Sequence, residues 1–115
     1  MNFNAYQVAT VMTAIYPEAG TGSNAALTYT ILGLTNEAGE VAGKFKKVLR
    51  DGDEAVTDEQ LVAELGDVLW YLARTADELG FSLDYIATKN LAKLQSRKTR
   101  RARPEEDNMT ICEGE

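Results

Sequence analysis

The sequence predicts an all-α fold in which four helices form a bundle. Its apolar residues recur at i, i+3, i+4 and i+7, the spacing of helices with one buried face, and they do not alternate as in strands. Only two prolines occur, and short loops separate the helical stretches, which favours antiparallel neighbours. The length of 115 residues suits a single domain. We expect this domain over residues 1–103 and a mobile tail over residues 104–115, where apolar periodicity is lost.

Turn and capping residues set the bounds of the first two helices. The first is expected over residues 4–16, because Pro17 and a glycine-rich stretch ending at Gly22 follow it. The second is expected to begin after Ser23, a good N-cap, and to run to Arg50. The expected buried faces are Tyr6, Val8, Val11, Met12 and Ile15 in the first helix and Leu27, Ile31, Leu34, Ala38, Val41, Phe45 and Val48 in the second.

Clear signals also bound the last two helices. Thr57 and Gln60 form a capping box at the start of the third helix, and Gly80 is placed to cap its end. The fourth is expected to follow Ser82 and to fray near Arg101. The expected buried faces are Leu61, Leu65, Val68, Leu69, Leu72, Ala76 and Leu79 in the third helix and Leu83, Ile86, Leu91 and Leu94 in the fourth.

Composition excludes several classes of function. The chain carries 18 acidic and 12 basic residues, a net charge of −6, whereas nucleic-acid-binding modules are usually basic, so no nucleic acid is expected as partner. Histidine is absent, which excludes His-based catalysis and His-ligated zinc. No stretch is long and apolar enough for a membrane span, and the first twenty residues lack a signal-peptide pattern. With a lone Cys112, these features indicate a cytoplasmic protein.

One sequence pattern occurs twice, on the second and third expected helices. Residues 34–41 and 61–68 both read Leu-x-x-Glu-x-Gly-acid-Val. At about 100° per residue, each copy places its two carboxylates on one shoulder of an apolar stripe. If the two stripes pack together, four carboxylates line one groove. These residues are Glu37, Glu40, Glu64 and Asp67.

Four carboxylates in one groove repel one another unless they take up protons or bind a cation. Ligands that are all oxygen suit Mg²⁺, with Mn²⁺ as a substitute, and Mg²⁺ commonly binds substrate phosphates as well. The pattern therefore indicates metal-assisted phosphate chemistry. The alternative is that each Glu-x-x-acid pair only solvates an exposed helix face. The glycines Gly39 and Gly66 favour a special role, since each costs about 1 kcal/mol in mid-helix. Close approach of the helices is one candidate reason.

Three stretches resemble the MazG-like nucleotide pyrophosphohydrolases. They are residues 33–41, 64–71 and 90–97, and the resemblance extends over residues 27–98. The family pattern, Glu-Glu-x-x-Glu followed by Glu-x-x-Asp, is matched except at Asn36, where the family has Glu. The resemblance implies a MazG-like helical domain that assembles as a homodimer or a dimer of dimers (a homotetramer). It also implies that Glu37, Glu40, Glu64 and Asp67 bind Mg²⁺, and that a nucleoside triphosphate is hydrolysed to its monophosphate and pyrophosphate.

Within that resemblance, Glu37 is the candidate general base. Asn90, Lys93 and Arg97 share one face of the fourth helix and are candidate substrate contacts, with a solvated helix end as the alternative. Lys44 is a candidate phosphate contact. Trp70 is a candidate for stacking on the base, with core or subunit packing as the alternative.

Three readings of the function stay open. The size suggests a phage MazZ-like branch acting on deoxynucleotides, with dGTP as the first expected substrate. Related all-helical enzymes suggest dUTPase-like or phosphoribosyl-ATP pyrophosphohydrolase activity instead. A different class of protein, a non-catalytic helical module that binds a metal or a partner, would show no turnover at all.

Overall fold

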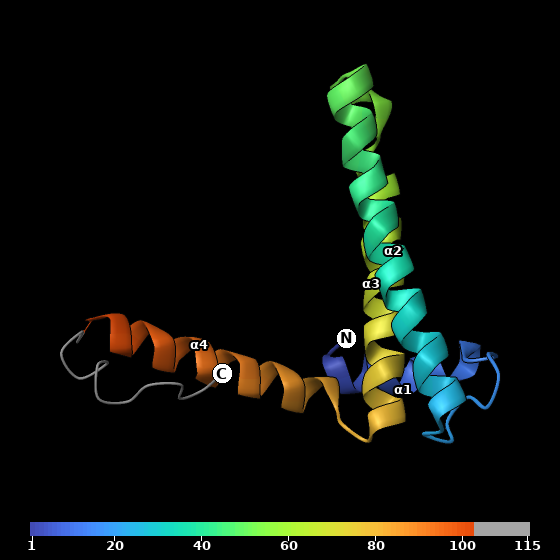
Figure 1. The fold of residues 1–115 in the computed structure, drawn as a ribbon, viewed down its shortest axis with the longest axis vertical. Helices are drawn as coiled ribbons and strands as arrows, with labels where there is room; N and C mark the ends of the chain where they lie inside the picture. Colours follow the sequence, from blue (N-terminus) through green and yellow to red (C-terminus); the bar gives the residue numbers. More distant parts are fainter. Residues whose placement is uncertain (103–115) are drawn as a thin grey trace. The chain divides into compact units, whose positions relative to one another are not determined.

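The structure, a computed structural model, describes residues 1–102, and over that range its regular elements are all helical (Figure 1). The α-helices are α1 (Phe3–Thr10), α2 (Asn24–Asp51), α3 (Asp58–Leu79) and α4 (Leu83–Ala102), and the short 3-10 helices are η1 (Val11–Thr13) and η2 (Asp53–Ala55). The predicted all-α fold is confirmed. Contacts divide the chain into two compact units, Met1–Ser82 and a second that begins at Leu83. The single domain over residues 1–103 stays a prediction, and the tail over residues 104–115 lies outside the described residues.

The first helix is shorter than predicted. Asn2 caps α1 by accepting a hydrogen bond from the Ala5 amide at 2.8 Å, but α-helical geometry ends at Thr10 and η1 follows. Tyr16 stands outside the helix and is buried, at 7% exposed. The residue before a proline is disfavoured in helical conformation, and Tyr16 precedes Pro17.

The predicted apolar face of the first helix is wrong except at Tyr6, which is half-buried. Within the chain Val8, Val11, Met12 and Ile15 are between 55% and 93% exposed. The buried residues of α1 are instead the polar Gln7 and Thr10. The reason lies in α3, which presents polar groups to α1. Gln7 donates to Asp77 at 2.6 Å, and Thr10 accepts from Arg74 at 3.2 Å.

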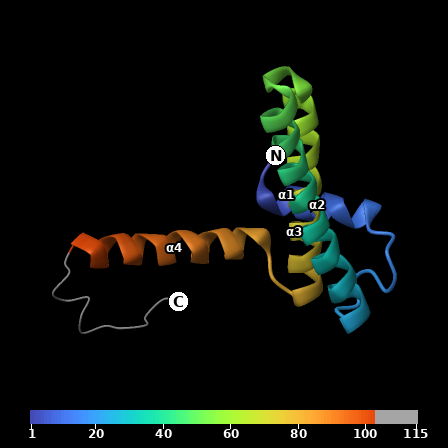
Figure 2. The same ribbon diagram turned by 45° about the horizontal axis from the view of Figure 1, so that its top comes forward.

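Helices α2 and α3 form an antiparallel hairpin and lie side by side in both views (Figures 1 and 2). Ser23 caps α2, and the predicted capping box of Thr57 and Gln60 is present at the start of α3. Gly80 ends α3 in the left-handed conformation, with φ of 84°, as predicted. This hairpin is the scaffold that carries the repeated acidic pattern.

The hairpin buries only part of its predicted apolar stripes. Leu34, Val41, Val48, Leu61 and Val68 are half-buried, as expected of residues between two helices. The prediction is wrong for another group, since a pair of helices covers one stripe of each helix and leaves the neighbouring stripe open. The exposed members are Ile31 (47%), Phe45 (52%), Leu65 (56%), Leu72 (37%) and Leu79 (51%), together with Ala38.

The expectation that Gly39 and Gly66 allow close helix approach is also wrong within the chain. A Cβ atom built at either glycine meets no other atom within 4 Å. Close approach occurs at Gly33 instead, where a Cβ would overlap the ring of Tyr71. The glycine that brings α2 against α3 therefore directly precedes the acidic pattern, one turn before Glu37.

Helix α4 forms a unit of its own. It begins at Leu83 after Ser82, as predicted, and continues to Ala102. Leu83 is buried, at 3% exposed, whereas Ile86, Leu91 and Leu94 of the predicted face are 36%, 67% and 47% exposed. None of the helices in the described part of the chain combines the length and hydropathy that a membrane crossing requires.

Candidate metal centre and nucleotide pocket

Three of the four predicted carboxylates meet across the hairpin. Glu37 of α2 and Glu64 and Asp67 of α3 each offer an oxygen atom, and these atoms lie within 4.8 Å of one another. Glu37 and Glu64 are half-buried, and Asp67 is exposed. The two copies of the sequence pattern thus face each other, as the helical geometry predicted. We call these residues the acidic triad.

Glu40 lies outside the acidic triad. It is exposed on α2, three residues beyond Glu37, which turns it about 60° further around the helix. Its role as a metal ligand stays a prediction.

The carboxylates of the acidic triad repel one another, and this repulsion is visible in the pKa of Glu37. Partial burial, and then the neighbouring carboxylates of Asp67 and Glu64, raise the pKa of Glu37 above its ordinary value of 4.5. The side-chain amide of Asn36 donates to Glu37 at 3.3 Å and acts in the opposite direction. Lys44 approaches Glu64 at 3.6 Å and supplies one positive charge. Asn36 and Lys44 therefore offset part of the repulsion.

The donor set fits a hard divalent cation. Three carboxylates on two helices offer only oxygen, the ligand type that Mg²⁺ and Mn²⁺ prefer over the nitrogen and sulfur ligands suited to zinc or copper. Asp67, the exposed member, lies toward solvent, where substrate phosphates could share the ion.

A pocket of about 460 Å³ lies beside the acidic triad. Thr13, Glu37, Asp67, Trp70 and Tyr71 line it. The indole N–H of Trp70 donates to the Thr13 hydroxyl at 2.8 Å, which fixes the plane of the indole. Burial, then Tyr29 and the carboxylates of Glu37 and Asp67, raise the pKa of Tyr71, so its phenol stays protonated next to the triad.

Four aromatic rings form a closed cycle behind this pocket. Tyr16 stacks on Tyr29 with centroids 5.1 Å apart, and it meets Trp70 edge-on at 6.3 Å. Trp70 meets Tyr71 edge-on at 4.9 Å, and Tyr71 lies 6.4 Å from Tyr29. Such geometries are favourable for aromatic pairs, so each ring is held by two neighbours. Trp70 is therefore both a packed residue and a pocket residue, and its stacking on a base stays a prediction.

The candidate contacts on the fourth helix belong to the second unit. Asn90, Lys93 and Arg97 lie along α4 with the predicted spacing, which places them on a common face of that helix. Their role toward the substrate stays a prediction.

Sequence reasoning missed several residues of the pocket and of the aromatic cycle behind it. Thr13 and Tyr29 lie in helical segments whose pattern suggested only packing, and no motif marks them. Tyr71 ends the recognised stretch 64–71 and follows Asp67 by one helical turn, which could have assigned it to the site. Asn36 departs from the family pattern, but its amide next to Glu37 is a natural hydrogen-bond donor, which the sequence alone could have indicated.

Comparison with known proteins agrees with this geometry. Residues 26–102 match the model of the MazG nucleotide pyrophosphohydrolase domain. The chain is also 50% identical over 104 residues to the Gene 37 protein of Mycobacterium phage L5, an alignment that covers 87% of this chain and 91% of that protein. No solved structure matches it. The matched region contains the triad, Trp70 and Tyr71.

Proposed function

Because this chain belongs to the MazG nucleotide pyrophosphohydrolase family, we propose that it hydrolyses a nucleoside triphosphate to the monophosphate and pyrophosphate with the help of a divalent cation. The observation that carries the proposal is the convergence of Glu37, Glu64 and Asp67 within 4.8 Å beside an aromatic-walled pocket.

The acidic triad would hold Mg²⁺, or Mn²⁺ in its place. When bound, the ion neutralises phosphate oxygens and makes an attacking water more acidic. Glu40, one turn beyond Glu37, is proposed as a further ligand. Its substitution Glu40→Gln is expected to weaken Mg²⁺ binding less than Glu64→Gln does, because Glu40 lies outside the triad.

Glu37 is proposed as the general base. Water attacks the α-phosphorus, the bond from that phosphorus to the bridging oxygen breaks, and pyrophosphate leaves while Glu37 takes the proton of the water. A base works best with a pKa near the working pH, and its surroundings shift the pKa of Glu37 in that direction. Asn36, which donates to one Glu37 oxygen, would leave the other oxygen for the water.

The pocket would receive the nucleoside. Trp70 offers an aromatic surface to the base, and such stacking accepts any base, which fits a site whose selectivity is set elsewhere. Lys44, Asn90, Lys93 and Arg97 are proposed as contacts to the phosphates and the sugar. The substrate we propose first is a deoxynucleotide, dGTP, in the cytoplasm, with dUTP and phosphoribosyl-ATP as alternatives.

A second copy of the chain is proposed to cover the open apolar stripes of the hairpin. Ile31, Phe45, Leu65 and Leu72 are between 37% and 56% exposed, and apolar side chains gain free energy when removed from water. A homodimer or a dimer of dimers would bury them. Gly39 and Gly66, which face open space in one chain, would then have a neighbour to approach.

The test is release of pyrophosphate and monophosphate from a panel of common NTPs and dNTPs with Mg²⁺, Mn²⁺ or EDTA. Turnover is expected to need the cation and to be lost in Glu37→Gln and Asp67→Asn. The matched control is Glu54→Gln, which removes an exposed carboxylate of η2 and should retain full activity. Folded, metal-supplemented protein that hydrolyses none of the substrates would favour the non-catalytic module instead.

A further inference from the structure

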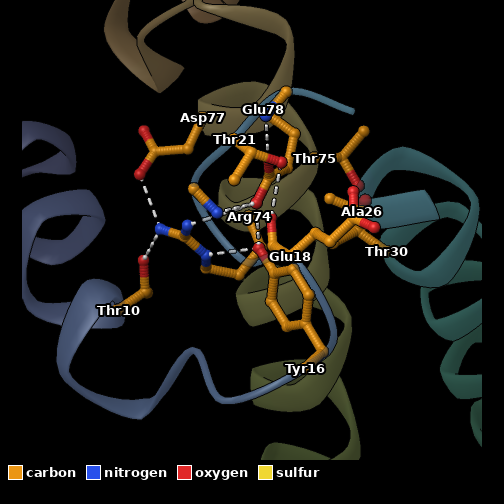
Figure 3. A network of polar contacts seen from close by, with 12 residues as sticks. Thr10, Tyr16, Glu18, Thr21, Ala26, Thr30, Arg74, Thr75, Asp77 and Glu78 are labelled. Carbon is orange, nitrogen blue, oxygen red and sulfur yellow. Dashed lines mark hydrogen bonds and ion pairs between the residues drawn. The ribbon is translucent and has the colours of Figure 1, made fainter. Parts of the chain in front are cut away.

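A buried polar network lies two to three turns beyond the acidic triad on α3 (Figure 3). Arg74 and Glu78 stand one turn apart with side chains 2% and 0% exposed, and their charged groups approach to 3.7 Å. Arg74 also pairs with Asp77. Burying such charges is costly unless each is fully paired, and a buried ion pair seldom adds stability over apolar packing. The proposed chemistry uses neither residue, so the network needs another explanation.

The Glu78 carboxylate holds the segment between η1 and α2. It accepts hydrogen bonds from the amides of Gly20 at 2.7 Å and Gly22 at 2.8 Å, and from the hydroxyl of Tyr16 at 2.5 Å (Figure 3). Burial alone would raise the pKa of Glu78, but these donors and Arg74 outweigh it and lower the pKa below its usual value. Glu78 is therefore a permanent anion at neutral pH.

The two glycines are required for this arrangement. Gly20 and Gly22 have φ of 86° and 71°, a conformation that other residues rarely adopt. A Cβ at Gly22 would also lie 3.1 Å from the backbone oxygen of Glu78. Glycine-rich loops often direct their amides at phosphate, but here the protein's own carboxylate takes that position. We call Glu78 and the three residues that donate to it, Tyr16, Gly20 and Gly22, the clasp.

Tyr16 connects the clasp to the aromatic cycle. Its hydroxyl accepts from Arg74 Nε at 3.1 Å while it donates to Glu78. Its ring is the one that stacks on Tyr29 and meets Trp70. Thr13, the hydrogen-bond partner of the Trp70 indole, is the last residue of η1 and lies three residues before Tyr16. Of the two residues that contact Trp70 from outside α3, Tyr16 is therefore held directly by Glu78, and Thr13 ends the helix η1 that leads into the segment held by Glu78.

We propose that Arg74 and Glu78 are positioning residues that set the aromatic wall of the nucleotide pocket through Tyr16 and Thr13. The identity of the ligand rests on the proposed function, but the structural link from Arg74 and Glu78 to Trp70 does not. Breaking the clasp should let the Trp70 indole move and so weaken binding of the nucleoside. The acidic triad is built from other residues and should keep its affinity for a divalent cation.

The experiment uses Trp70 as its own reporter, because it is the only tryptophan in the chain. Tyr16→Phe retains the stacked ring but removes the hydroxyl, Glu78→Gln retains the shape but removes the charge, and Glu54→Gln is the matched control on η2. In both clasp variants we expect a red-shifted Trp70 emission and easier quenching by acrylamide. We expect KM for the best nucleoside triphosphate to rise about tenfold, the size of one lost stacking contact, with kcat changed less than about threefold. Binding of Mn²⁺ alone, followed by its electron paramagnetic resonance signal, should match the wild type.

The possible outcomes distinguish the link between Glu78 and Trp70 from the proposed hydrolysis. Folded Glu78→Gln and Tyr16→Phe proteins with wild-type emission and wild-type KM would overturn the proposal. If Glu78→Gln fails to fold, then Tyr16→Phe and Thr13→Val decide, since Thr13→Val removes the hydrogen bond to the indole together with only one local bond, from the Thr13 hydroxyl to the Thr10 carbonyl. A wild type that hydrolyses no nucleoside triphosphate would sink the proposed function, while an altered Trp70 emission in the variants would still establish the link.

Discussion

Neutralising one member of the acidic triad should make the metal-free protein more stable than wild type. Once Mg²⁺ is added, the same variant should be less stable than wild type. The perturbation is Glu37→Gln. Glu37 has two carboxylates with oxygen atoms within 4.8 Å, and at that distance each like-charge pair costs about 0.9 kcal/mol in water and up to about 3.5 kcal/mol at an effective dielectric constant of 20. Since the site is partly open and Lys44 offsets some charge, a net gain of about 1–2 kcal/mol is expected.

The pH dependence has a definite sign. The folded pKa of Glu37 is raised, so its proton adds stability that is fully present below the ordinary pKa of 4.5 and is lost as pH rises through the folded pKa. Glu37→Gln should abolish that loss. Near neutral pH in EDTA, its midpoint of thermal unfolding should therefore exceed that of wild type by about 4–8 °C.

Added Mg²⁺ should reverse the order. A ligand at a hundred times its dissociation constant stabilises the folded state by about 2.7 kcal/mol, and the variant lacks one ligand for it. Thermal unfolding followed by circular dichroism, with Glu54→Gln as control, reads both effects. A Glu37→Gln protein no more stable than wild type in EDTA would refute the view that the carboxylates are already gathered before metal binds.

Four further predictions concern single residues. Lys44→Met should tighten Mg²⁺ binding at low ionic strength by up to about fivefold, because it frees Glu64 from its ion pair, and calorimetric titration should show the gain shrinking with salt. Gly33→Ala should destabilise the fold by about 1–3 kcal/mol by overpacking against Tyr71, as measured by urea unfolding. Gly66→Ala should instead stabilise it by about 0.5–1 kcal/mol if its face stays open, and should weaken a dimer seen by ultracentrifugation if a second copy packs there. Because the pKa of Glu78 is lowered, ionised Glu78 stabilises the fold above pH 4.5, and this contribution is lost as pH falls through the folded pKa. The free energy of unfolding, measured by urea unfolding at several pH values, should therefore fall less with decreasing pH in Glu78→Gln than in wild type.

Local signals in the sequence predicted the helices well. The capping box at Thr57 and the left-handed Gly80 depend on residues within one turn, and both appear as expected. The facing of Glu37 with Glu64 and Asp67 also followed from helical geometry, because the two patterns share one register.

The buried faces could not be predicted in the same way. Apolar periodicity marks every stripe that avoids water, but it does not say which stripe is covered within the chain and which is left for another partner. Leu72 and Leu79 fit the pattern and are exposed, whereas Arg74 and Glu78 break it and are buried. Their burial depends on Tyr16, Gly20 and Gly22, more than fifty residues earlier, and no local pattern reports such a contact.

The polar residues of α3 follow a regular spacing. This spacing accounts for the position of the acidic triad and for the wrong prediction of the buried face of α3. Its members follow one another at intervals of three, four, three and four residues, which places them within about 80° around the helix. A bundle normally fills such a stripe with apolar side chains, so each polar member must be compensated by a neighbour. At the Glu64 end, the function that we propose leaves the compensation to a cation and a substrate; at the Glu78 end, Tyr16, Gly20 and Gly22 supply it. The members are Glu64, Asp67, Tyr71, Arg74 and Glu78.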